Sequence, residues 1–297
     1  MNTDSRAGLG YGLAAYGLWG LFPLFFQLFG RSGAVEVVAH RATWSLVFCL
    51  VLIGLLGQWL QLRAALADRR LVAALAVAGG LIVVNWGTYV FAVLSERTLE
   101  TALGYFINPL AVAALGILVL GERLRPLQWT AMAFGVASVV VMVVGYGEIP
   151  WIALTLAGSF GLYSLVKKVA GRSVGALPGL AIETGAVAPV AIGYLGYLAM
   201  TGQSTADGGY ALLLAATGIV TAVPLLLFAA AARRVSMVTI AILQYLAPIG
   251  QFLLGWLVFH EPMPPARWAG FALVWAAVAV FIADALLTGR RRARLPA

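Results

Sequence analysis

Charged residues are scarce in this chain, and apolar residues are in excess. Asp, Glu, Lys and Arg make up 10% of the 297 residues, 62% are hydrophobic, and the mean hydropathy is +0.97. Soluble domains contain about a quarter charged residues. A water-soluble core cannot bury this excess, so we expect lipid to surround much of the chain. The length accommodates about ten membrane spans of about 20 residues, which leaves no room for a separate soluble enzymatic domain.

Cysteine and histidine are almost absent. The single cysteine, Cys49, permits no internal disulfide, and the two histidines, His40 and His260, belong to different spans. The sequence also lacks a Walker motif, an HExxH motif and a GxSxG elbow. We therefore expect no metal, no cofactor and no enzymatic activity. The net charge of +8 is spread over short clusters rather than one basic face, which excludes nucleic acid as a partner.

Ten apolar segments can be marked along the chain. The first is too long for a typical signal-peptide core and lacks a small-residue cleavage site, so we interpret it as a retained span. An all-α polytopic membrane protein with ten transmembrane helices follows from these segments. Their approximate bounds are 8–29, 36–57, 71–94, 100–120, 127–145, 149–167, 177–200, 209–232, 237–258 and 266–287.

The basic residues favour one orientation. With the N- and C-termini cytoplasmic, fifteen of the 19 Lys and Arg residues lie on the cytoplasmic side. This positive-inside bias also supports an even number of spans. The residues on the outer side are Arg31, Arg41, Arg97 and Arg267.

An internal repeat relates two parts of the chain. The stretch Pro109–Trp129 matches Pro248–Trp268 at an offset of 139 residues, and both copies read P-x12-E-x3-P-x2-W. The repeat-matched Glu122 and Glu261 fall on opposite sides of the membrane, where we interpret both as residues of loops or helix ends.

The repeat divides the chain into residues 1–147 and 148–297, each with five spans. An odd number of spans inverts one half relative to the other, as in many secondary transporters. We therefore expect a solute site near the midplane where the two halves meet.

Local motifs then identify a family. The stretches His40–Ser45, Leu103–Leu110 and Leu120–Arg123, with shorter ones in the second half, resemble the RarD family of the EamA-type drug/metabolite transporter (DMT) superfamily. The resemblance covers nearly the whole chain. It implies an inner-membrane permease of the bacterial type, and the family is named for chloramphenicol sensitivity.

Polar and aromatic residues inside the spans are candidates for the solute cavity, because polar groups are costly at membrane depth. The alternative interpretation is interhelical packing and hydrogen bonding. The cavity candidates are Trp19, Asn85, Trp86, Tyr105, Asn108, Tyr163, Thr221, Gln244 and Tyr245. Four prolines that would loosen the helices are candidate hinges, namely Pro23, Pro109, Pro224 and Pro248.

Four ionisable residues are candidates for gating or charge recognition. Arg41 would attract an anionic group and His40 would take up a proton, unless Arg41 extends to the outer interface beside Glu36. Glu183 would be a proton site or a gate that pairs with Lys167, or else half of a static ion pair.

The favoured function is a secondary transporter that exports small amphipathic or zwitterionic metabolites, and drugs such as chloramphenicol, by alternating access. The expected partners are the lipid bilayer, the organic solute and a coupling proton. Small residues in several spans permit close packing within the chain or in a homodimer. Two alternatives stay open, a non-transporting membrane subunit of a larger assembly and a membrane enzyme acting on lipid.

Overall fold

Helices make up the fold, and the described residues contain no strand. The structure is a computed structural model that describes residues 3–121, 123–169 and 174–294. The first half contains α1 (Thr3–Phe26), η1 (Gln27–Phe29), α2 (Ala34–Leu55), α3 (Trp59–Ala67), α4 (Arg69–Leu94), α5 (Thr98–Leu120) and α6 (Pro126–Tyr146). The second half contains α7 (Trp151–Val169), α8 (Ala176–Met200), α9 (Gly208–Ala232), α10 (Met237–Leu243), α11 (Leu246–Leu253), the π-helix η2 (Leu254–Val258) and α12 (Pro265–Arg294).

Local signals set the helix ends. Asp68 caps α4 by accepting hydrogen bonds from the backbone N–H groups of Arg70 and Leu71, so two of the unpaired amides of the first turn are satisfied. Gly121 and Gly147 end α5 and α6 in the left-handed conformation, which glycine adopts without steric cost.

Every predicted apolar segment lies on helical residues. Eight helices are long and apolar enough to cross a membrane, and Trp151–Lys167 and Leu246–Val258 are shorter apolar helices. Two features differ from the sequence-based expectation. The short helix α3 was not predicted, and the segment 237–258 is divided into α10, α11 and η2 instead of forming one span.

Pro248 explains the break between α10 and α11. Proline has no amide hydrogen to donate to the carbonyl of Gln244, four residues earlier, and its ring crowds that carbonyl. The helix accordingly stops at Leu243 and restarts at Leu246. The other candidate hinges, Pro23, Pro109 and Pro224, lie inside continuous helices.

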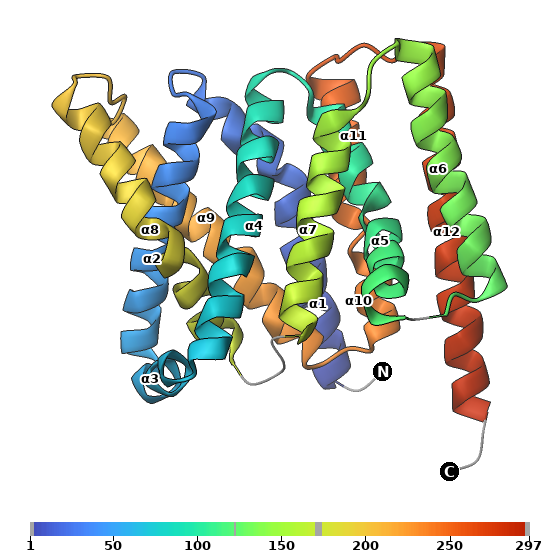
Figure 1. Ribbon diagram of the computed structural model, residues 1–297, viewed down its shortest axis with the longest axis horizontal. Coiled ribbons are helices and arrows are strands. Elements are labelled where there is room, and N and C mark those ends of the chain that lie inside the picture. Colours follow the sequence, from blue (N-terminus) through green and yellow to red (C-terminus); the bar gives the residue numbers. More distant parts are fainter. Residues whose placement is uncertain (1–2, 122, 170–173, 295–297) are drawn as a thin grey trace.

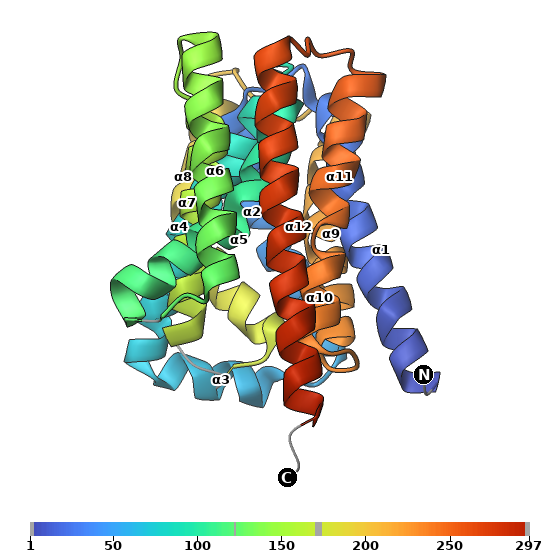
Figure 2. The ribbon, with the colours of Figure 1, turned by 90° about the vertical axis from the view of Figure 1, so that its right-hand side faces the viewer.

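The helices lie side by side across the molecule (Figure 1). We call the end that holds the first and last described residues the lower end, and the opposite end the upper end. A quarter turn shows α6 and α12 paired at one edge, with α3 crossing the lower end (Figure 2).

Most helix contacts join the first half of the chain to the second. α2 packs against α8 and α9, α4 against α7 and α8, α1 against α9 and α11, α5 against α7 and α11, and α6 against α12. Two glycines permit close approach, because a methyl group at Gly79 would overlap the backbone of Glu183 on α8, and one at Gly218 would overlap that of Trp44 on α2. The interior is thus formed jointly by both halves.

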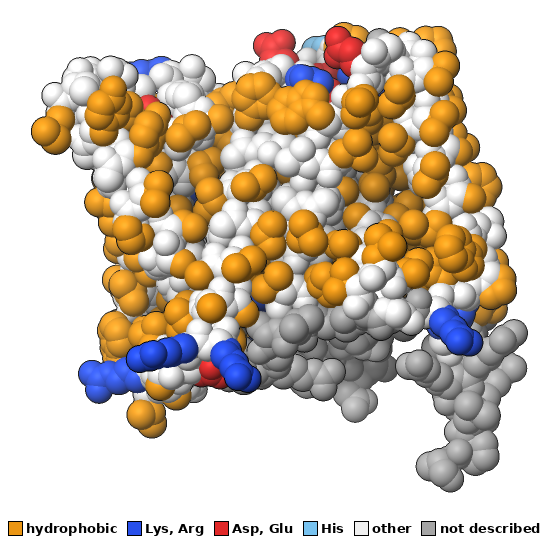
Figure 3. Space-filling view, viewed as in Figure 1, with side chains coloured by type: hydrophobic (Ala, Val, Ile, Leu, Met, Phe, Trp, Pro, Cys, Tyr) orange, Lys and Arg blue, Asp and Glu red, His pale blue; other side chains and the backbone are white. Residues whose placement is uncertain are grey.

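The surface matches a lipid environment. Apolar side chains cover most of the visible face, Lys and Arg gather along the lower end, and Asp and Glu gather at the upper end (Figure 3). Exposed large hydrophobic residues such as Leu118, Val144 and Val190 lie on long helices, where water would disfavour them.

Candidate functional site

Arg41, on α2, is buried among aromatic rings. The residue is only 4% exposed. Its guanidinium lies 4.1 Å from the ring centroid of Trp86 and 5.1 Å from that of Phe26. Its Nε donates a hydrogen bond to Thr221 Oγ1 on α9 at 2.8 Å. The expected alternative, an arginine extending beside Glu36 to the outer interface, is therefore wrong. Glu36 instead accepts a hydrogen bond from the backbone N–H of Thr205.

Asn85, on α4, joins three helices. Its Nδ2 donates to Ser159 Oγ and to the carbonyl of Leu156 on α7, each at 3.1 Å, and its Oδ1 accepts a hydrogen bond from Tyr105 Oη on α5 at 3.1 Å. Because Asn85 is 2% exposed, these bonds offset the cost of burying its amide. Two of the cavity candidates, Asn85 and Tyr105, are thus in direct contact, together with Ser159.

Glu183, on α8, pairs with two residues of α7. Its Oε1 lies 2.5 Å from Lys167 Nζ, and its Oε2 accepts a hydrogen bond from Tyr163 Oη at 3.1 Å. The carboxylate is 1% exposed, whereas the lysine side chain is 33% exposed. The predicted contact between Lys167 and Glu183 therefore exists. The structure describes nothing of Arg172 or Glu122, which lie outside its described residues.

A row of aromatic rings connects these three groups. Tyr89 lies 6.0 Å from Tyr105 between ring centroids, Tyr105 lies 6.4 Å from Phe160, and Phe160 lies 5.7 Å from Tyr163. The Arg41 guanidinium is within electrostatic reach of the Tyr89 and Tyr105 hydroxyls. We call this set the central row, consisting of Arg41, Thr221, Trp86, Tyr89, Asn85, Tyr105, Ser159, Phe160, Tyr163, Glu183 and Lys167.

The remaining candidates differ in where they lie. Tyr245 stacks on Phe106 in a separate apolar cluster. Trp19 packs against Tyr16 and Phe228 and also against the cluster that contains Trp86 and Tyr89 of the central row. Gln244 lies in the break between α10 and α11. Two further candidates hold buried atoms without a hydrogen-bond partner among the described residues, namely Asn108 Oδ1 and both ring nitrogens of His40.

The upper end is closed by polar contacts between the α1–α2 and α8–α9 connections. Arg31 pairs with Asp207 at 2.9 Å, and this hydrogen-bonded carboxylate raises the pKa of the Arg31 guanidinium. Ser32 Oγ lies 2.6 Å from Thr205 Oγ1 and 2.9 Å from Tyr210 Oη. These contacts link one half of the chain to the other at that end.

A second upper contact involves Glu261, in the connection before α12. Its carboxylate accepts hydrogen bonds from the backbone N–H groups of Thr98 and Leu99, at the first turn of α5. Burial raises the pKa of this carboxyl above its ordinary value, although these hydrogen bonds oppose the shift. Glu261 was interpreted as a simple loop residue; it caps α5 from the other half of the chain.

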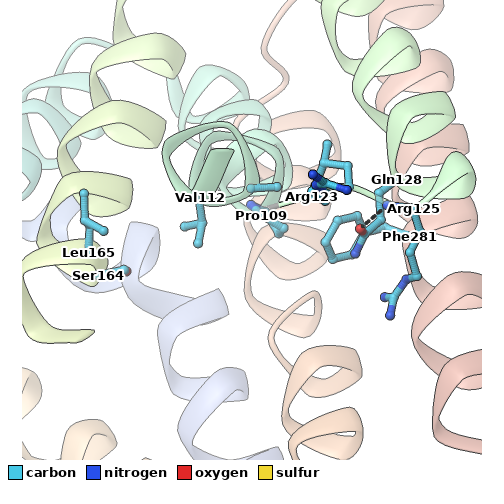
Figure 4. A pocket seen from close by; sticks show the side chains of 11 residues that line it. Pro109, Val112, Arg123, Arg125, Gln128, Ser164, Leu165 and Phe281 are labelled. Atoms are coloured by element: carbon cyan, nitrogen blue, oxygen red, sulfur yellow. Dashed lines mark hydrogen bonds between the residues drawn. The ribbon is translucent and has the colours of Figure 1, made fainter. Parts of the chain in front are cut away.

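A cavity of about 500 Å³ opens at the lower end. It extends from Arg123 and Arg125, in the α5–α6 connection, to Pro109 at the middle of α5, with Ser164 and Leu165 of α7 on one side (Figure 4). Arg125 is paired with Asp284 of α12. None of the described residues that line the cavity belongs to the central row, although Tyr105 lies one helical turn from Pro109 on α5.

Sequence reasoning missed several residues of these sites. Gln251 accepts a hydrogen bond from Thr101 Oγ1 at 3.1 Å and donates one to the carbonyl of Trp19 at 3.3 Å, which joins α11 to α5 and α1. Tyr89 and Ser159 were also not predicted. For Tyr89 the available signal was its repeat match with Phe228, whereas an isolated serine in an apolar span gave none.

Known proteins resemble this chain in sequence and in fold. The model of the EamA-like transporter family matches residues 149–283. Protein RarD of Streptomyces exfoliatus is 51% identical over 99% of this chain and 94% of its own length. The chloramphenicol-sensitive protein RarD of Pseudomonas aeruginosa is 32% identical over 98% of this chain and 96% of its own length. A crystal structure of a protein with 18% identity superposes with a TM-score of 0.60 over 98% of this chain and 99% of that chain, which shows the same fold.

The similarity to RarD proteins extends over nearly the full length of both chains, and the predicted motifs lie within it. The helices long enough to span a membrane and the transporter family together make the chain a multi-pass membrane protein of the permease type. The chain belongs to the RarD family of the EamA-type drug/metabolite transporter superfamily.

Proposed function

We propose that the chain is a secondary transporter that moves small amphipathic organic solutes across the bacterial inner membrane by alternating access, in the export direction. The observation that carries the proposal is the central row, where polar groups are buried between helices of both halves. Polar groups at membrane depth are retained where they face a solute path or one another. The cavity at the lower end reaches Pro109 at the middle of α5, one helical turn from Tyr105 of this row along the chain.

The proposed architecture has ten spans in two inverted halves, residues 1–147 and 148–297, with both termini cytoplasmic. Eight long helices and two shorter apolar ones support the number of spans. The basic lower end and the location of both described termini there support the orientation (Figures 1 and 3). The lower end is then the cytoplasmic side.

In this orientation the contacts at the upper end and the cavity at the lower end support an inward-open state. The upper, outer end is closed by Arg31–Asp207, Ser32–Thr205 and the Glu261 cap of α5. The cavity between α5, α6, α7 and α12 opens to the cytoplasmic side. A solute that entered there would move along the central row once the outer contacts open and the inner ones close.

The proposal is tested by counterflow in proteoliposomes that contain the purified chain. Liposomes preloaded with unlabelled chloramphenicol are diluted into labelled chloramphenicol, and parallel samples use aromatic and aliphatic metabolites. We expect transient accumulation of at least one labelled solute above protein-free liposomes. The matched control is Arg63→Gln on the exposed face of α3, which removes one positive charge away from the cavity. Absence of accumulation for every solute would favour the non-transporting subunit instead.

A further inference from the structure

Arg41 is a buried cation without an acidic partner. No Asp or Glu among the described residues lies within 4.0 Å of its guanidinium, whereas Arg31, Arg97, Arg125 and Lys167 each have such a partner. Thr221 engages only Nε, and the two terminal amino groups make no hydrogen bond to the described residues. Those groups are the pair that binds a carboxylate side by side.

Burying an uncompensated charge is unfavourable, so the arrangement requires a reason. The faces of Trp86, Phe26 and Phe22 attract the guanidinium and offset part of the cost. They provide no acceptor for its terminal N–H groups. An anionic ligand would provide both the charge and the acceptors.

Tyr89 adds a second unused group at the same place. Its hydroxyl is buried and has no hydrogen-bond partner among the described residues, and its ring lies 5.9 Å from that of Phe26, which in turn lies 5.1 Å from the Arg41 guanidinium. A phenol hydroxyl can donate a second hydrogen bond to a carboxylate that the guanidinium binds. The site therefore combines a cation, a free donor and aromatic walls.

The position in the second half that corresponds to Arg41 is occupied by Glu183, which already has a partner of opposite charge. Arg41 is the eighth residue of α2, and Glu183 is the eighth residue of α8. Glu183 is bound by Tyr163 and Lys167, four residues apart on α7, whereas Arg41 faces Phe22 and Phe26, four residues apart on α1. In the second half, Lys167 of the chain itself neutralises Glu183. In the first half, none of the residues that the structure describes neutralises Arg41, so a ligand would have to supply the negative charge.

We propose that Arg41 binds the carboxylate of the transported solute, and that this solute is a monocarboxylate with an aromatic or aliphatic body. The inference rests on the proposed transport function and names its substrate class. One guanidinium neutralises one negative charge, and Lys167, at the other end of the central row, is already neutralised by Glu183, so a doubly charged phosphate or dicarboxylate would keep an uncompensated charge. The rings of Phe22, Phe26 and Trp86 accommodate the apolar body.

The test measures binding to the purified full chain in detergent by calorimetry. The probes are 3-phenylpropionate and its amide, 3-phenylpropanamide, which differ in the negative charge. We expect the carboxylate to bind about tenfold or more tightly than the amide, because only it forms the charge-assisted pair with Arg41. Arg41→Gln should abolish this difference, because the affinity for the carboxylate falls to that for the amide. Equal affinities for the two probes, an affinity for the carboxylate unchanged in Arg41→Gln, or no carboxylate binding at millimolar concentration would each overturn the proposal.

Two variants control for structural effects. Arg63→Gln removes an exposed positive charge on α3 and should bind both probes as the unmodified chain does. Arg41→Gln should melt at the same temperature as the unmodified chain or higher, because it removes an uncompensated buried charge. If Arg41→Gln does not fold, Arg41→Lys is tested instead. It keeps the positive charge, so it should still bind the carboxylate more tightly than the amide. Equal affinities of Arg41→Lys for the two probes would overturn the proposal.

Counterflow of a neutral solute separates this inference from the transport function. Chloramphenicol carries no carboxylate, so its exchange by the unmodified chain tests the permease independently of the Arg41 site. Exchange without carboxylate binding would overturn the Arg41 site and leave the permease. Arg41-dependent carboxylate binding without exchange of any solute would overturn the permease and leave the site.

Discussion

At the scale of residues, Lys167 and Glu183 have unequal access to water. The glutamate is 1% exposed and the lysine side chain 33% exposed. Lys167→Met should therefore leave a carboxylate buried without a counter-ion and reduce stability by about 3–5 kcal/mol. Glu183→Gln should cost less, since the lysine that remains can still reach solvent and the amide can still accept from Tyr163.

The measurement is the thermal unfolding of both single variants and of the double variant in detergent. The double variant should be more stable than Lys167→Met, because it removes the unpaired charge as well. Equal losses of stability in Lys167→Met and Glu183→Gln would contradict the difference in burial between the two side chains. Arg63→Met, on the exposed face of α3, is the control for removal of a cation.

The sequence predicted which polar residues would be buried better than it predicted their partners. Arg41, Asn85 and Glu183 were identified because a polar group in an apolar span must be satisfied inside the protein. The bond between Arg41 and Thr221 joins residues 180 positions apart, so it depends on how α2 packs against α9. The proton roles of His40 and Glu183 stay predictions.

At the scale of elements, the packing of α4 against α8 depends on one glycine. A methyl group at Gly79 would overlap the backbone carbonyl of Glu183, and a backbone in a helix cannot yield as a flexible side chain does. Gly79→Ala should therefore force the helices apart and destabilise the protein by about 1–3 kcal/mol. It should also weaken the contact between Glu183 and Lys167, because Glu183 moves with α8.

The neighbouring glycine provides the matched control. A methyl group at Gly80 would meet no atom within 4 Å, and alanine favours the helix over glycine. Gly80→Ala should melt at the temperature of the unmodified chain or above it. If the two variants melted alike, the close approach of α4 and α8 would be contradicted.

Hydropathy located the long helices because each must present apolar side chains to lipid along its whole length. Hydropathy does not reveal where a helix is interrupted. The break between α10 and α11 at Gln244 and Tyr245 was therefore missed, although Pro248 marked it. The helix α3 was missed because its nine residues are too few to span a bilayer and are less apolar than those of the long helices.

At the scale of the whole molecule, the two ends differ in how the halves are joined. The upper end has polar contacts across the halves from Arg31, Ser32 and Glu261, whereas the lower end contains the cavity. Alternating access requires the upper contacts to break in each cycle. The Arg31–Asp207 pair is exposed, so breaking it exchanges a bond within the protein for bonds to water at small cost, whereas the buried Glu261 cap costs more to break.

A reversible cross-link at the upper end tests this requirement. Ser32 Oγ and Thr205 Oγ1 are 2.6 Å apart, so cysteines at both positions have their sulfur atoms within bonding reach. Cys49, the single native cysteine, is buried and should not compete. Oxidation of the Ser32→Cys/Thr205→Cys variant should reduce counterflow to the rate of protein-free liposomes, and reduction should restore it. Each single-cysteine variant should exchange solute equally in both redox states. Full counterflow by completely cross-linked protein would mean that the halves do not separate at this end, and alternating access through it would have to be abandoned.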